Sequence, residues 1–503
     1  MSGTDLRQAA LSGARWTMAA KLGLQLVTWP ITIVVIRLLE PSDYGLQAMA
    51  MVTIGFVALF GEMGLGVALV QAEKLDEATA RTAAAAILIC NVAIAVILWV
   101  LAPWASLWFD EPDLDDVMRV LMLELLISSV ATVPCAQLER QLRFRHLSIA
   151  AMASGLAGAL TTLALAFFGY GVWSLVFGSL AGAIVRAGLI VLFNGRLIWP
   201  SMRHAFRPIK SLVRFGSHVL AARTLWYWYG QSDQLILGRL LHTSLFGHYN
   251  VGSQLAMMPA SKAMEVINRV SFPVLSRLRA DQGDLRAMHI RLLGLVAAYA
   301  FGACWAMAAT APELVAVLLG TKWHTAITAL MLLGMVAPLR MLSALNNTIT
   351  SAAGAPQAST TELALAGVLL PAALATGAWF GGFLGACLAW PLAYPVVYWV
   401  SNRLTCQTVG NRRAQGWVTL RGPVTAGIAM WVSIVALRWQ LIGVVSPVVL
   451  LLAELAFGLL VYVGVFRMAA PAIARESRTL MLDLMRPSRS SAAPAKPANA
   501  ASG

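Results

Sequence analysis

The chain has 503 residues, of which 59% are hydrophobic and 12% are charged, and its formal net charge is +14. Soluble globular proteins carry about 25% charged residues, so this composition excludes a water-soluble domain and indicates a protein that faces lipid. The five cysteines stand at no metal-binding or redox spacing, and we expect them to behave as small apolar side chains.

Apolar runs of about 20 residues, the length that crosses a bilayer, predict fourteen transmembrane helices. No cleavage pattern follows the first run, so it is expected to be a retained helix. The run at 246–270 is the least apolar, and 360–380 is separated from 382–402 only at a pair of glycines. The predicted spans are 15–38, 44–70, 83–108, 117–138, 147–169, 171–194, 211–231, 246–270, 289–311, 325–350, 360–380, 382–402, 421–440 and 442–466.

Lysine and arginine are distributed unevenly between the two sides of these spans. With the N-terminus inside, 28 of the 37 basic residues fall in inside segments, five in outside segments or at their edges, and four within spans. The positive-inside rule therefore predicts that both termini are cytoplasmic. This topology explains the basic charge without nucleic acid and makes anionic lipid headgroups the expected neighbours.

A short phrase occurs twice in the chain. RLLEPSDYG begins at Arg37 and RLLHTSLFG at Arg239, and their matching residues are 202 positions apart. Each copy lies in a short outside turn, and six spans separate them, so the two halves are expected to run parallel about an axis along the membrane normal. FGYGVW at Phe168 and FGGFLG at Phe380 repeat in the same way between equivalent spans.

The repeat predicts an all-α polytopic membrane protein with two parallel six-helix lobes. The expected divisions are 1–196 for the first lobe, 197–410 for the second, 411–470 for two further helices and 471–503 for a cytoplasmic tail, which is rich in proline, serine and alanine and disordered towards its end. Two similar lobes that rock about a central site are typical of transporters.

Four basic side chains fall within predicted spans, where a charge costs about 2.5–3.5 kcal/mol. We expect them to face a wet cavity between the lobes and to bind an anionic cargo, because guanidinium groups make paired hydrogen bonds to phosphate. These candidate substrate-binding residues are Arg223, Arg340, Lys262 and Arg186, with Arg223 the leading one. In the alternative, Arg186 snorkels to the inner headgroups and Lys262 pairs with Glu265. Arg340, two residues after a proline, has the alternative of binding freed carbonyls.

Acidic and aromatic residues in the spans suggest two further roles. A buried carboxylate can take up a proton, so Glu62 and Glu265 are candidates for ion coupling; the alternative is pairing with a cavity cation. Trp226 and Trp228, with Asp233 just beyond, are candidate sugar contacts; the alternative is an aromatic belt at the membrane interface.

Three segments of the sequence resemble one known family. RLLEPSDYGLQAMAMVTIGFVALFGEMGLGVALVQ (Arg37–Gln71) looks like the polysaccharide transporters of the multidrug/oligosaccharidyl-lipid/polysaccharide (MOP) exporter superfamily. LERQLRFRHLS (Leu138–Ser148) and NNTITSAAGAPQAS (Asn346–Ser359) resemble further segments of that family. The resemblance implies a two-lobed, V-shaped MATE-like fold with a central cavity. In the second copy of the repeated phrase, His242 and Thr243 depart from the family pattern.

The resemblance also implies an activity, that of Wzx-type flippases of the exopolysaccharide subtype, of the colanic-acid or xanthan kind. Such proteins move undecaprenyl-diphosphate-linked oligosaccharides from the cytoplasmic to the periplasmic leaflet of the bacterial inner membrane. The expected partners are that lipid-linked glycan, membrane lipids, H+ or Na+ as coupling ion, and a polysaccharide polymerase and co-polymerase. No cofactor, no metal and no nucleic acid are expected.

Two alternative functions stay open. One is another MOP exporter, for a peptidoglycan precursor or drugs. The other is a membrane enzyme that polymerises or ligates the same lipid-linked glycan. The enzyme is disfavoured because the longest outside loop, Trp108–Asp116, carries acids but no base, and because no nucleophile–base spacing or metal motif occurs.

Overall fold

The computed structural model describes residues 23–62, 77–201, 207–280 and 284–475. In these ranges the regular structure is entirely helical, and ten helices are long and apolar enough to cross a membrane. The predicted all-α polytopic membrane fold is therefore confirmed. The proposed division of the chain at residues 196, 410 and 470 remains a prediction.

The first half of the chain forms a bundle of helices joined by short turns. Its helices are Gly23–Leu38, α2 (Pro41–Glu62), α4 (Glu77–Phe109), α5 (Leu114–Leu121), α6 (Leu123–Arg140), α7 (Phe144–Phe167) and α8 (Val172–Asn194). Together α5 and α6 cover the fourth predicted span. Gly195, in the left-handed region at φ 80°, ends α8 in the way that glycine commonly ends helices.

The second half repeats this order and adds two helices. Its elements are α9 (Arg207–Leu240), α10 (Thr243–Ala280), α11 (Leu285–Ala309), α12 (Ala311–Leu318), the 3₁₀ turn η1 (Thr321–Trp323), α13 (Ala326–Ala352), α14 (Pro356–Val409), α15 (Arg413–Leu441) and α16 (Pro447–Ala469). Each of the fourteen predicted spans corresponds to one of these helices, to a half of α14 or, for the fourth, to α5 and α6. The helix Gly23–Leu38 is apolar but shorter than the ten candidate spans of the described residues, and α9 and α10 are not among these ten.

Two glycines with the same backbone conformation mark equivalent turns in the two halves. Gly171, before α8, has φ 52° and ψ −133°, and Gly382, within α14, has φ 55° and ψ −137°. Side chains with a Cβ rarely adopt this region, so glycine is required at both turns. Gly382 divides α14 into two spans that fold back on each other, as the FGYGVW and FGGFLG repeat predicts.

Small residues let these paired helices pack closely. A Cβ atom on Gly158 of α7 would lie 3.0 Å from the carbonyl oxygen of Gly178 on α8. In the second half, a Cβ atom on Gly377 would overlap the carbonyl oxygen of Gly385 across the bend in α14. Close approach of backbones at small residues is a common way for helices to associate in lipid.

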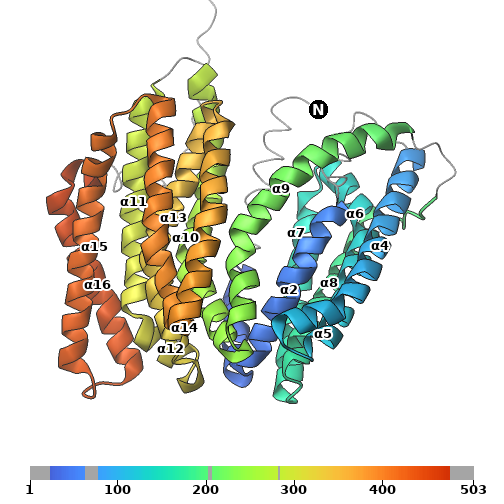
Figure 1. Cartoon of the computed structure of the whole chain (residues 1–503), viewed down its shortest axis with the longest axis horizontal. Helices are drawn as coiled ribbons and strands as arrows, with labels where there is room; N and C mark the ends of the chain where they lie inside the picture. Colours follow the sequence, from blue (N-terminus) through green and yellow to red (C-terminus); the bar gives the residue numbers. More distant parts are fainter. Residues whose placement is uncertain (1–22, 63–76, 202–206, 281–283, 476–503) are drawn as a thin grey trace, which may run out of the picture.

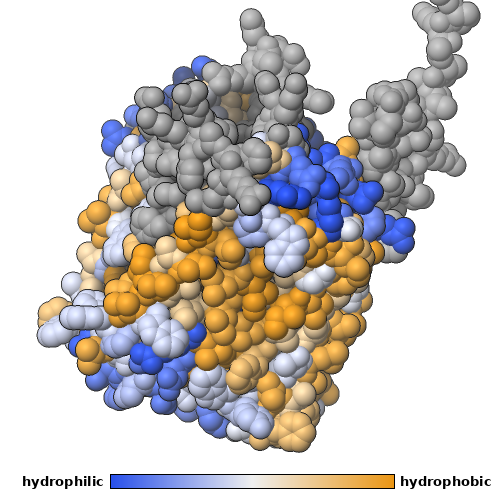
Figure 2. All heavy atoms as spheres, turned by 90° about the vertical axis from the view of Figure 1, so that its right-hand side faces the viewer, coloured by the Kyte–Doolittle hydropathy of each residue, from blue (hydrophilic) through white to orange (hydrophobic). Residues whose placement is uncertain are grey.

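Figure 1 shows two groups of helices that come together at one end. The first group holds α2 and α4 to α8, the second holds α10 to α16, and α9 leans over the first group before it meets both. We call the joined end, which carries turns 39–40, 110–113, 241–242 and 319–325, the outer end, following the charge-based topology. The opposite end is the inner end. Figure 2 shows an apolar band on the first group between two hydrophilic ends, as expected of a membrane-embedded surface.

Candidate substrate cavity

The two copies of the repeated phrase meet at the outer end, where α2 and α10 begin and pack against each other. A Cβ atom on Gly45 would overlap the carbonyl oxygen of Thr243, and one on Gly247 would overlap the carbonyl oxygen of Pro41. Glycine at these two positions therefore allows the backbones of the two helix starts to touch. The duplicated phrase builds a near-symmetric contact between the halves of the chain.

Polar bonds reinforce this closure. The Nε of Arg37 donates to the carbonyl oxygen of Leu318 at 2.9 Å, and Nζ of Lys322 lies 3.0 Å from Oε1 of Glu40. The buried indole of Trp323 donates to a carbonyl oxygen of the helix Gly23–Leu38 at 2.9 Å. The first half is thus tied to the segment around η1 of the second, and the outer end is closed.

A cavity of about 420 Å³ lies in the inner half of the first group, between α2, α4, α6, α8 and α9. Two of the predicted substrate-binding residues line it: Arg186, from α8, and Arg223, from α9. They are 37 positions apart in the sequence and come from helices of different halves of the chain. Polar side chains of α4 and α6 complete the lining, among them Asn91, Ser128 and Thr132.

The cavity also contains an acid that the sequence interpretation missed. Glu139, near the inner end of α6, lines the same space as the two arginines, and the thiol of Cys135 lies 3.8 Å from its Oε1. Among the described residues that line this space, two guanidinium groups and one carboxylate leave a positive balance, which suits an anionic ligand. The sequence offered one indication of this position. Glu139 follows Cys135 by four residues, which places both side chains on the same face of a helix.

A second polar cluster joins two predicted residues for which different roles were expected. The guanidinium of Arg340, on α13, lies 4.7 Å from the ring centre of Trp390, on α14, and within electrostatic reach of Asp233, on α9. Oδ2 of Asp233 accepts a hydrogen bond from the hydroxyl of Tyr249 at 2.9 Å, and the same hydroxyl accepts one from Trp390 at 2.8 Å. Arg340 and Asp233 therefore belong to one network that is separate from the cavity.

The remaining predicted residues lie elsewhere. Lys262 is exposed on α10 and is not part of the cavity lining. Trp226 is 51% exposed, whereas Trp228 donates from its indole to the carbonyl oxygen of Gly367 on α14 at 2.7 Å. Glu62 and Glu265 lie on α2 and α10, but their side chains are outside the described residues.

The bundle closed at one end, with a cavity lined by two arginines among its membrane helices, defines a transporter-like fold. Solved structures share it. The lipid II flippase MurJ in an inward closed conformation matches with a TM-score of 0.70 at 10% identity, over 93% of this chain and 99% of that one. An inward-facing multidrug resistance MATE family transporter of the MOP superfamily matches with a TM-score of 0.58 at 14% identity, over 76% and 95%. At these identities the likeness concerns the fold.

The sequence then places the chain within this class. A profile of polysaccharide biosynthesis proteins matches residues 34–328, which is more than half of the chain. The chain belongs to this polysaccharide biosynthesis protein family.

Curated relatives extend the match. The lipopolysaccharide biosynthesis protein WzxC of Escherichia coli (strain K12) is 24% identical over 339 residues, 67% of this chain and 68% of that protein. The succinoglycan biosynthesis transport protein ExoT of Rhizobium meliloti (strain 1021) is 27% identical over 328 residues, 64% of each. The aligned part thus spans about two thirds of these relatives.

Proposed function

We propose that this protein is a flippase that moves undecaprenyl-diphosphate-linked oligosaccharides from the cytoplasmic to the periplasmic leaflet of the bacterial inner membrane. It works by alternating access in exopolysaccharide or lipopolysaccharide biosynthesis, and the exopolysaccharide subtype is the one we favour. Both termini are cytoplasmic in this proposal, which makes the inner end the side where cargo enters.

The observation that carries the proposal is the cavity with Arg186 and Arg223. Its volume of about 420 Å³ lies within the range of roughly 300–1,000 Å³ of ligand pockets. A diphosphate has several oxygens that accept charge-assisted bonds from guanidinium groups, and hydroxyl and amide side chains suit sugar hydroxyls. A state that receives cargo from the cytoplasmic side needs a closed outer end and a cavity in the inner half. Both features are present.

The names of the relatives support transport rather than glycan polymerisation. ExoT is named a succinoglycan biosynthesis transport protein, and the structural neighbour MurJ is named a lipid II flippase. Both names concern movement of a glycan or a lipid-linked precursor. A peptidoglycan precursor or a drug remains the alternative cargo.

Further residues enter the proposal with separate roles. Arg340 and Lys262 offer secondary positive charge to the cargo, and Trp226, Trp228 and Asp233 offer sugar contacts. Coupling to H+ or Na+ involves Glu62 and Glu265, and a polymerase and co-polymerase receive the flipped glycan. Arg340 and Asp233 act together, since they share one network.

The test uses Arg223→Ala and Arg186→Ala in a strain that depends on this protein. Spheroplasts of each strain are treated with a glycan-cleaving enzyme that does not cross the membrane, and the protected lipid-linked glycan is measured. We expect both variants to retain the glycan in the cytoplasmic leaflet at normal protein levels. Arg403→Ala is the matched control, because Arg403 stacks on Trp399 at 5.7 Å and does not line the cavity.

Two outcomes contradict the proposal. If the Arg223→Ala strain delivers glycan at the rate of the control, the cavity is not the cargo site. If the variants deliver glycan to the periplasmic leaflet but leave it unpolymerised, the protein is a glycan polymerase or ligase instead.

A further inference from the structure

A buried carboxyl lies towards the inner end of the second group of helices, apart from the cavity. Glu362, on the first half of α14, is 4% exposed. Its carboxyl interacts with Ser401 from the second half of α14 and with Ser343 and Asn347 from α13. It stands six residues after Pro356, the start of α14, about 9 Å along the helix.

The groups around this carboxyl are polar but bring no positive charge to it. Among the described residues, no lysine or arginine acts on Glu362. Tyr394, on the second half of α14, is a titratable neighbour, and it lies within electrostatic reach of Arg340 as well. Of the other helices packed against α14, α9 and α10 contribute Asp233 and Tyr249 to the Arg340 network. α11 brings the titratable His289 beside Asn346, and its Arg286 donates to the carbonyl oxygen of Val409 at the far end of α14. α15 brings no charge to Glu362 in the described part. An ionised carboxylate without a cation is costly in such a place, so the neutral acid is favoured.

Three buried polar atoms beside Glu362 form no hydrogen bond of good geometry within the described ranges, although Ser343 lies against Glu362 and Asn346 against His289. They are Oγ of Ser343, Oδ1 of Asn346 and Nε2 of His289, on side chains whose residues are at most 2% exposed. Asn346 donates to Oγ of Ser401 at 3.3 Å and adjoins His289 of α11. Buried polar atoms of this kind are where ordered water or a small ligand binds.

A polar path connects this space to the inner end. Nδ2 of Asn411, a partly exposed residue in the turn before α15, lies 3.0 Å from Nδ1 of His289. His289 adjoins Asn346, which bonds Ser401, which in turn interacts with Glu362. The path thus runs over α11, α13 and both halves of α14.

We propose that Glu362 is a proton-binding site that is loaded from the inner end along this path. The proton adds to a carboxylate oxygen and leaves by the same path, with no redox step. A proton suits the site better than Na+ because it removes the buried charge, whereas Na+ leaves the carboxylate ionised. Tyr394 conveys the change of charge to the Arg340 network. This effect on transport rests on the proposed function; the proton site itself does not.

The test is infrared spectroscopy of the purified full chain in lipid nanodiscs, titrated with pH without any glycan. We expect a carbonyl band of a protonated carboxylic acid near neutral pH, its loss at alkaline pH, and its absence from Glu362→Gln. Glu362→Asp keeps a titrating band. Glu77→Gln is the control, because Glu77 is an exposed surface carboxylate beside Arg81, and it leaves the band unchanged.

A kinetic measurement tests the path separately. After a pH jump, His289→Gln slows proton uptake but reaches the same final band as the unaltered chain. A band that persists in Glu362→Gln, or a band that NaCl removes while choline chloride does not, overturns the proton site. Because no glycan is present, failure of glycan delivery in the strain assay would contradict only the proposed function.

Discussion

Gly45 and Gly247, 202 positions apart in the chain, face each other across the contact that closes the outer end. A Cβ atom on Gly247 would lie 3.1 Å from the backbone nitrogen of Gly45, in addition to its overlap with Pro41. In the alternating-access cycle proposed above, this is the contact that separates when the outer end opens. The duplicated phrase lies at the contact between the two groups of helices.

Gly247→Ala tests this joint. The added methyl group has no room, and overpacking of this kind costs roughly 1–3 kcal/mol. We expect a lower thermal unfolding temperature of the purified chain and faster labelling of a cysteine placed at the outer end. Gly230→Ala is the control, because a Cβ atom there meets nothing within 4 Å. Equal unfolding temperatures and labelling rates for the two variants would show that the close contact is not essential.

The ion pair between Glu40 and Lys322 is expected to make a small contribution to the stability of the closed outer end. The two side chains are 63% and 35% exposed, and exposed pairs contribute about 0–1 kcal/mol. Glu40→Lys should speed labelling at the outer end, more so at low salt, and Glu40→Lys combined with Lys322→Glu should restore the slower rate. Reversing the charges of Glu77 and Arg81, a surface ion pair on α4, should leave the labelling rate at the outer end unchanged. A double variant as fast as Glu40→Lys would exclude the pair as a latch.

Arg438 anchors the last two helices and is predicted to be important for stability. Its Nη2 lies 2.6 Å from Oε2 of Glu313 on α12, and its Nε lies 3.1 Å from Oε1 of Glu454 on α16. Arg438→Met leaves two buried acids without their cation, and breaking a buried ion pair costs about 3–5 kcal/mol. Denaturant unfolding should show a much smaller loss of unfolding free energy for Glu454→Gln, because Arg438 keeps its ion pair with Glu313 in that variant. Similar losses of unfolding free energy for Arg438→Met and Glu454→Gln would contradict this assignment.

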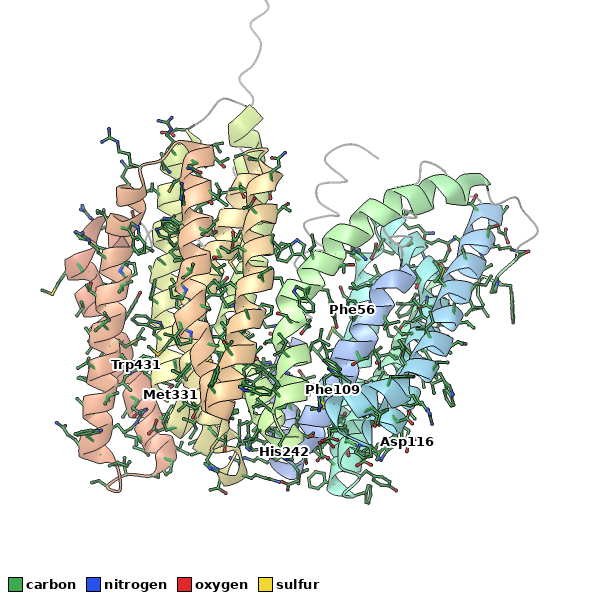
Figure 3. All side chains as sticks on the ribbon, in the orientation of Figure 1. Phe56, Phe109, Asp116, His242, Met331 and Trp431 are labelled. Carbon is green, nitrogen blue, oxygen red and sulfur yellow. The ribbon has the colours of Figure 1, made fainter. Side chains whose placement is uncertain are left out.

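Glu111, in the outer turn between α4 and α5, is expected to make stability depend on pH. Burial, together with Asp113 and Asp110, raises the pKa of this carboxyl above its ordinary value, although His242 opposes the change. The folded state then binds more protons than the unfolded state, so stability is largest below the ordinary carboxyl pKa and falls as pH rises through the folded one. Figure 3 shows His242 at the same outer end.

Glu111→Gln should remove that part of the pH dependence. Thermal unfolding of the purified chain, followed from acid to neutral pH, should show a shallower decline for Glu111→Gln than for the unaltered protein. Asp116→Asn, an exposed neighbouring acid on α5, should behave like the unaltered protein. Parallel curves for all three proteins would show that Glu111 titrates alike in both states.

Trp228 offers a way to separate a sugar contact from a structural role. Trp228→Phe keeps an aromatic face but loses the indole bond to Gly367, which is worth about 0.5–1.5 kcal/mol. If the ring stacks on sugar, glycan delivery should persist in Trp228→Phe and fall in Trp228→Ala at equal protein levels. Equal glycan delivery by Trp228→Phe and Trp228→Ala would mean that Trp228 contributes only its hydrogen bond to α14.

The sequence alone determined the class of protein and the main course of the chain. Hydropathy is summed over local windows, and a helix satisfies its own backbone, so each span is readable without knowing its neighbours. The glycines of the repeats also carried information, since φ near 52–55° at Gly171 and Gly382 is a local demand. The family match and the all-helical fold agree with these predictions.

Only the tertiary structure decided which charged side chains meet. Arg186 and Arg223 share a cavity, whereas Arg340 turns to Trp390 and Asp233; no spacing in the sequence distinguishes these outcomes. Glu362 was overlooked because it lies at the edge of a predicted span, where an acid looks like an ordinary helix end. The partner of a side chain depends on the rotation and tilt of its helix against others, and that arrangement is set by packing over the whole bundle.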